Sequence, residues 1–144
     1  MSLDRSYIEE NHQSTQRIRD LVARLSEAEM QHPVGPDWTV AIALAHLAFW
    51  DRRVLYVLDK TEQDGKVFVP EIDIFVNDLS LPLWAAIPPR EAARIAIETA
   101  ERLDFRLENF SPALLEEIYG YNKRWVVRAL HRSEHLDEVD AALK

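Results

Sequence analysis

Three histidines are the residues of this sequence whose types and spacing suggest chemistry. His131 and His135 are four residues apart. Four helical residues rise about 6 Å, slightly more than one turn, so both rings would point to the same side and could reach a single metal ion. His46 is the only ionisable side chain between Asp37 and Asp51, and a buried imidazole without a partner is costly. His46, His131 and His135 are therefore the candidate metal ligands.

Each of these histidines also has an ordinary structural explanation. His46 could bond to a backbone carbonyl or a carboxylate inside the core. His131 and His135 could lie on a half-exposed helix face, and the neighbouring Glu134, Asp137 and Glu138 would then be salt-bridge partners. The same three carboxylates are candidates for orienting the rings of metal-bound histidines, although a surface role is the simpler interpretation.

The other two histidines have weaker patterns around them. His12 lies beside Asn11 near the apolar stripe of the N-terminal stretch, and we expect both side chains to be exposed. His32 lies in a proline-rich turn and has no evident partner.

Three imidazole ligands would leave one coordination position open, which is typical of a catalytic or substrate-binding metal rather than a structural one. Zinc and nickel are the leading candidates, and iron or manganese also suits nitrogen ligands. The chain has no cysteine. It therefore contains no thiolate ligand, and a thiol used in its chemistry would have to arrive with a substrate or cofactor.

The elements that must position these histidines are helices. Prolines divide the chain, and apolar residues recur at helical spacing between them. The stretch from Val40 to Trp50 is apolar on all sides except at His46, as in a buried helix, and Asp37 or Thr39 is a plausible N-cap. We expect four long helices over about 4–30, 37–60, 89–110 and 122–143, a polar loop at 61–66, and short helices at 70–79 and 112–120.

This pattern predicts an all-α four-helix bundle in a single domain, residues 1–144. The long region between the second and third helices would allow a crossover connection. With only 3 glycines, the chain lacks the turns of an all-β protein.

Composition narrows the function classes. A net charge of −8 and the lack of a basic block disfavour a nucleic-acid partner. No apolar run is long enough to span a bilayer and no signal peptide is visible, so no membrane partner and a cytoplasmic location are expected.

The sequence resembles the DinB-like superfamily, which includes mycothiol-dependent maleylpyruvate isomerases and bacillithiol-dependent S-transferases. Three segments carry the resemblance over essentially the whole chain. They are Asp37-Trp38-Thr39-Val40 with Leu44-Ala45-His46-Leu47-Ala48-Phe49-Trp50-Asp51, the linking segment from Leu81 to Ala92, and the pair His131 and His135. The resemblance implies a metal-binding four-helix bundle with His46, His131 and His135 as ligands, and a homodimer.

Two hypotheses of function follow. The first is a metal-dependent enzyme, an S-transferase, isomerase or hydrolase that acts on a small molecule with a low-molecular-weight thiol. The alternative is a non-catalytic bundle that binds or sequesters a small molecule, or only dimerises. Metal analysis of histidine variants separates the two hypotheses.

Overall fold

The protein, described here from a computed structural model over residues 3–144, is built from helices, with one small hairpin. Four long helices form the bundle: α1 (Ser6–Arg24), α2 (Val40–Asp64), α4 (Pro89–Glu108) and α6 (Ala129–Ala142). The shorter elements are a 3-10 turn (Glu29–Gln31), β1 (Pro33–Val34), β2 (Trp38–Thr39), α3 (Phe75–Ala85), α5 (Pro112–Tyr121) and a 3-10 turn (Lys123–Trp125). The predicted all-α bundle with short extra helices is confirmed. Residues 1–2 of the predicted domain lie outside the described part.

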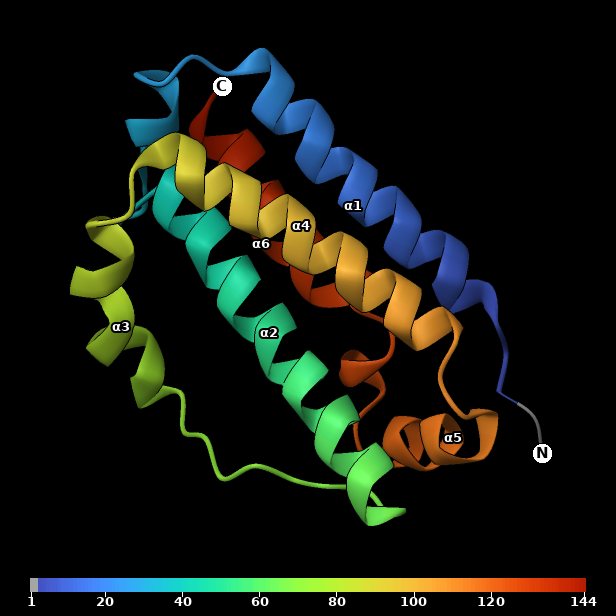
Figure 1. The fold of residues 1–144 in the computed structure, drawn as a ribbon. Coiled ribbons are helices and arrows are strands. Elements are labelled where there is room, and N and C mark those ends of the chain that lie inside the picture. The colour runs from blue at the N-terminus through green and yellow to red at the C-terminus, as the bar shows by residue number, and fades with distance from the viewer. Residues whose placement is uncertain (1–2) are drawn as a thin grey trace.

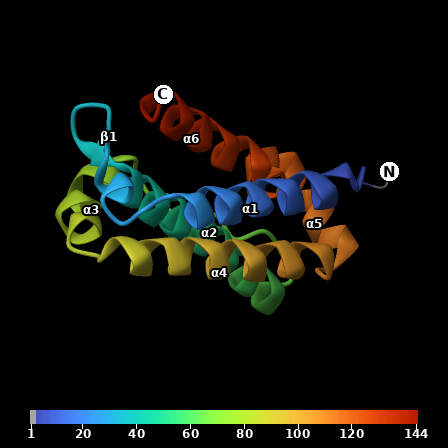
Figure 2. The same cartoon turned by 90° about the horizontal axis from the view of Figure 1, so that it is seen from above.

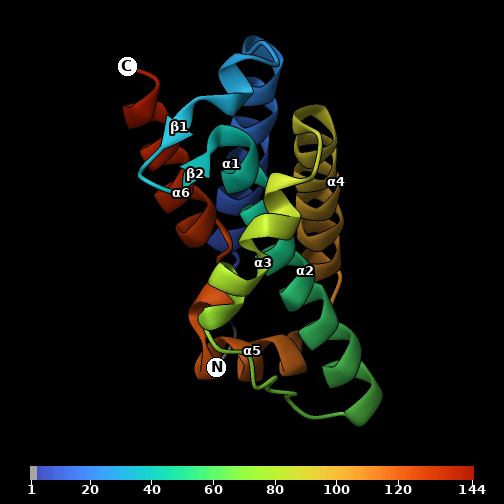
Figure 3. The ribbon, with the colours of Figure 1, turned by 90° about the vertical axis from the view of Figure 1, so that its left-hand side faces the viewer.

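The connection between α2 and α4 is a crossover. The chain leaves the end of α2, returns along the outside of the bundle through α3, and enters α4 at the end where α2 began (Figures 1 and 3). α2 and α4 therefore run in the same direction, and α1 and α6 run the opposite way (Figure 1). In Figure 2, α1 lies between α4 and α6 and contacts both, while α2 packs against the same two helices.

The core lies where the four long helices meet. Ile18, Leu44, Ala96 and Leu136 come one from each helix, and none is more than 1% exposed. Burial of such aliphatic side chains stabilises the fold, by about 1.5–3 kcal/mol for each one of leucine size.

No helix within residues 3–144 combines the length and apolar character needed to cross a membrane.

The first helix ends earlier than the predicted Met30. Ser26 and Glu29 form a reciprocal cap, in which each side chain accepts a hydrogen bond from the other residue's backbone N–H. This pairing stabilises a new helical start, so α1 ends at Arg24 and a separate 3-10 turn follows.

The second helix is longer than predicted. It starts at the expected cap, where the Thr39 hydroxyl accepts from the backbone N–H of Ile42. It then runs through the predicted polar loop to Asp64 and ends where Gly65 adopts a left-handed conformation with φ 72°. Thr61 explains the extension, because its side chain is buried and its hydroxyl accepts from the backbone N–H of Phe68.

The short helix predicted over residues 70–79 lies further along the chain, at Phe75–Ala85, and Pro82 lies inside it. A proline removes one hydrogen bond from a helix interior. Here the carbonyl that loses its partner is that of Asp78, an exposed residue, and water can satisfy it.

The last helix is shorter than the predicted 122–143, because Asn11 interrupts it. The Asn11 amide donates to the carbonyl of Val126 and accepts from the backbone N–H of Ala129, at 2.8 and 2.9 Å. These bonds satisfy backbone groups at a break between the 3-10 turn and α6. The expectation that Asn11 is exposed was wrong, since only 1% of it is accessible.

Candidate metal centre

His46 enters the core from α2. The first turns of α2 are covered on several sides, by α4, α6, α3 and the hairpin, and this explains a helix that is apolar nearly all round. Only 3% of His46 is exposed. Its Nδ1 atom is buried and has no hydrogen-bond partner within the described residues.

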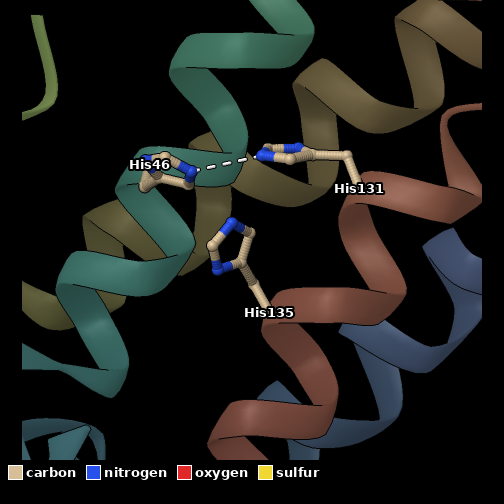
Figure 4. A group of neighbouring side chains, drawn as sticks. All are labelled: His46, His131 and His135. Atoms are coloured by element: carbon tan, nitrogen blue, oxygen red, sulfur yellow. Dashed lines mark hydrogen bonds between the residues drawn. The ribbon is translucent and has the colours of Figure 1, made fainter. Parts of the chain in front are cut away.

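His131 and His135 meet His46 from the facing helix, α6. Figure 4 shows both rings on the side of α6 that faces His46. One ring nitrogen from each of the three histidines lies within 4.8 Å of the other two. The closest approach, 3.2 Å, joins Nε2 of His46 to Nε2 of His131. The structure therefore brings together the three residues that sequence spacing selected, and metal binding by them stays a prediction.

Two of the rings are neutral at physiological pH. Burial, with repulsion from His135 and Arg128, lowers the pKa of His46 to about 3. Burial and the same kind of repulsion, chiefly from Arg128, lower the pKa of His131 to about 2. Neutral imidazole is the form that binds a metal. Three imidazoles that meet from two helices therefore suit a divalent cation.

One of the three nearby carboxylates contacts the cluster. Glu138 accepts a hydrogen bond from Nδ1 of His135 at 2.6 Å, which turns the Nε2 atom of that ring toward the other histidines. Glu134 pairs with Arg124, and Asp137 pairs with Arg17. The surface interpretation holds for those two, and Glu138 is the residue that orients a ring.

Tryptophan rings surround the histidines. The ring centroid of Trp38, in β2, lies 4.6 Å from that of His46 and 5.6 Å from that of His135. Trp84 lies edge-on to His46 at 5.5 Å, and Trp50 at 6.2 Å. These rings pack against His46 and cover one side of the cluster.

A cleft of about 480 Å³ opens beside the cluster, between the hairpin and α6. Its shape depends on the hairpin turn, where Gly35 takes a left-handed φ of 72° that other residues rarely adopt. The cleft gives small molecules a route to His135. The lining residues are Val34, Gly35, Pro36, Asp37, Trp38, His135, Glu138 and Ala142.

Next to the histidines lies a group of buried charges that sequence reasoning missed, which we name the charged network: Asp51, Asp104, Arg128 and Arg132. Asp51 accepts from Nε of Arg128 at 2.8 Å and from Nε of Arg132 at 3.0 Å. Arg132 also donates to Asp104 at 2.8 Å, and all four residues are at most 4% exposed. Arg128 and Arg132 are four residues apart and His131 lies between them, a spacing that could have indicated a shared buried face.

The remaining histidines lie away from the cluster. The His12 side chain is exposed, as expected, and its Nε2 atom lies 3.5 Å from Oε2 of Glu108. His32, for which the sequence indicated no partner, is 2.8 Å from the carbonyl of Ala142 through its Nε2 atom.

The fold and the cluster together define a four-helix bundle with three converging histidines. The family model of the mycothiol maleylpyruvate isomerase N-terminal domain matches residues 12–117, and the chain belongs to this family, within the DinB-like superfamily. His46 lies inside the matched range, whereas His131 and His135 follow it. Searches of curated proteins and of solved structures give no match.

Proposed function

We propose that His46, His131 and His135 bind one divalent metal ion, with zinc or nickel as the first candidates and iron or manganese as the others. The observation that carries this proposal is the convergence of three ring nitrogens within 4.8 Å, one from a buried and two from partly buried side chains. Two of these rings are neutral because burial lowers their pKa. A site of three neutral nitrogens keeps the charge of the ion, and this favours an anionic nucleophile.

We further propose that the protein is an enzyme acting on a small molecule, as an S-transferase, isomerase or hydrolase. A divalent ion at this position would lower the pKa of a bound thiol or water near neutral pH. The name of the matched family, mycothiol maleylpyruvate isomerase, supports a low-molecular-weight thiol as the second substrate. The absence of cysteine agrees with this, because the chain has no thiol of its own.

The residues around the cluster suit that role. Glu138 holds the His135 ring through Nδ1, and Trp38 packs over the rings of His46 and His135. The cleft beside His135 is of a size that suits a small molecule.

We also propose a cytoplasmic homodimer. Apolar side chains stand exposed on α3, with Phe75 66%, Leu79 75% and Leu83 71% accessible, and a second copy could cover them. Light scattering of the purified protein tests the oligomeric state, and a monomer at all concentrations would refute the homodimer.

Elemental analysis tests the metal. Protein purified without chelators should carry about one equivalent of metal, and the variants His131→Ala and His135→Ala should carry little. The matched control is His12→Ala, because His12 is exposed and distant from the cluster. Equal metal content in all four proteins would refute the site.

Activity has a separate test. Turnover of a model electrophile is measured with a panel of low-molecular-weight thiols, before and after metal removal. Turnover that is lost on chelation and restored by added metal is expected. A protein that binds metal at the three histidines but turns over no thiol would support the non-catalytic alternative.

A further inference from the structure

The hydrogen bonds around the three rings determine where each proton lies. Arginine has only donors, and Nη2 of Arg128 lies 3.2 Å from Nδ1 of His131. Nδ1 of His131 is therefore the acceptor in that contact. A neutral imidazole has one N–H, so the proton of His131 is on Nε2, the atom 3.2 Å from Nε2 of His46.

The His46 ring has the opposite arrangement. Its Nε2 accepts from His131, so its own proton is on Nδ1. Nδ1 of His135 donates to the carboxylate of Glu138 at 2.6 Å, so Nε2 is the atom that this ring turns toward the other two. His46 thus carries a lone pair on Nε2, which is what a metal ion requires, whereas His131 carries a proton on Nε2.

Arg128 is held firmly in the position that causes this. Its Nε donates to Asp51 at 2.8 Å, and its Nη1 donates to the backbone carbonyl of Arg124 at 2.8 Å. Only 4% of Arg128 is exposed. The guanidinium cannot turn away from His131 without breaking one of these buried bonds.

We propose that Arg128 sets the metal affinity of this centre by holding His131 in the tautomer that opposes metal binding. For a metal ion to bind Nε2, the single proton of His131 would have to be on Nδ1, with no net gain or loss of protons. Nδ1–H would then face the Nη2–H of Arg128, donor against donor, and the hydrogen bond between them would be lost. The loss of this hydrogen bond would weaken the binding of every metal ion by the same amount. The ions that bind imidazole most weakly would therefore be the first to leave the site empty.

This inference rests on the proposed metal site, and metal titration tests both. Zn²⁺ affinity is measured against a chromophoric chelator for wild type and for Arg128→Gln, whose amide oxygen can accept from Nδ1–H. Groups that support a metal ligand usually strengthen binding, and their loss weakens it about 10–100-fold. For Arg128→Gln we expect a change of similar size in the opposite direction, a tighter affinity.

The matched control is Arg124→Gln. Arg124 is a second positive charge that lowers the pKa of His131, but its side chain pairs with Glu134. Arg124→Gln therefore removes a positive charge near His131 and leaves the hydrogen bond from Arg128 to Nδ1 in place. Arg128→Gln must tighten Zn²⁺ binding clearly more than Arg124→Gln does, and an equal or smaller gain would overturn the proposal.

Nitrogen-15 NMR of metal-free wild type tests the same inference without any variant. The expected tautomers are Nε2–H for His131 and Nδ1–H for His46, with His131 changing to Nδ1–H when Zn²⁺ is added. A metal-free His131 already protonated on Nδ1 would overturn the role of Arg128. If no Zn²⁺ binds to any of the proteins, the metal site itself is refuted.

Discussion

The histidine cluster and the charged network both place polar side chains in the core where α2 and α6 face each other. In the charged network, two carboxylates pair with two guanidinium groups. The guanidinium of Arg132 donates to three side chains, those of Asp51, Asp104 and Thr15. In the histidine cluster, the three rings meet one another. Each group contains one buried nitrogen without a hydrogen-bond partner among the described residues, Nη2 of Arg132 in the network and Nδ1 of His46 in the cluster.

The difference indicates two kinds of task. Buried charges that are paired and hydrogen-bonded lock helices together in one register. In the histidine cluster, three ring nitrogens converge, and the bond between His131 and His46 would have to open for a metal ion to bind. The network would therefore hold α1, α2, α4 and α6 in place, and the cluster would use that rigidity to present three nitrogens. Arg128 is the residue that belongs to both, through Asp51 and His131.

The largest expected effect comes from breaking the charged network. Asp51→Ala leaves Arg128 and Arg132 without their shared carboxylate, and loss of one partner of a buried pair costs about 3–5 kcal/mol. Chemical denaturation measures the free energy of unfolding. The control is Asp59→Ala, also on α2, whose partner Arg106 is partly exposed and whose loss should cost about 0–1 kcal/mol. Similar costs for the two variants would show that the network adds no special stability.

Metal should act in the opposite direction, on the cluster. Free Zn²⁺ at 100 times its dissociation constant should stabilise the protein by about 2.7 kcal/mol, because the unfolded chain lacks the site. Chelation should remove that gain, as measured by thermal unfolding with and without a chelator. His135→Ala should show no stabilisation by Zn²⁺, and a gain that persists in this variant would place the metal elsewhere.

Acid should weaken the metal-free protein through the cluster. The pKa values of His46 and His131 in the folded state, about 3 and about 2, lie below the ordinary 6.5. The unfolded chain therefore binds more protons below pH 6.5, and stability present above that pH is lost as the pH falls towards 3. Each ring contributes up to about 1.4 kcal/mol per pH unit. Denaturation at several pH values measures this loss, and His131→Leu should reduce the slope. An unchanged slope would contradict the assignment.

The smallest effect is expected at the edge of the cluster. Glu138→Ala removes the acceptor that orients His135 and should weaken Zn²⁺ binding about tenfold. Asp137→Ala, which removes a surface partner of Arg17, is the control and should leave the affinity unchanged. Chelator competition measures both. A loss of affinity in Glu138→Ala, set against a gain in Arg128→Gln, would separate a residue that supports the ligand set from one that opposes it.

Local patterns predicted much of the fold. Helical spacing and proline positions located the four long helices, and Thr39, one of the two predicted caps, caps α2. The errors have two kinds of cause. Asn11 delays the start of α6 through a bond to Val126, 115 residues away in sequence, and a single sequence does not display such a long-range hydrogen bond. The ends of the first two helices depend instead on short-range bonds, between Ser26 and Glu29 and between Thr61 and Phe68, which the spacing of apolar residues does not report.

For the candidate site, the sequence by itself determined which residues could serve as ligands. The spacing of His131 and His135 follows from helix geometry, and an ionisable His46 within an apolar helix marks a buried position. Glu138 and Arg128 are each three residues from the ring that they bond to, so local spacing already brings them near. Only the tertiary structure decided that α2 and α6 face each other, so that Nε2 of His46 meets Nε2 of His131 and Asp51 holds Arg128. Those contacts join residues 85 and 77 positions apart in sequence, and they exist only once the helices have packed.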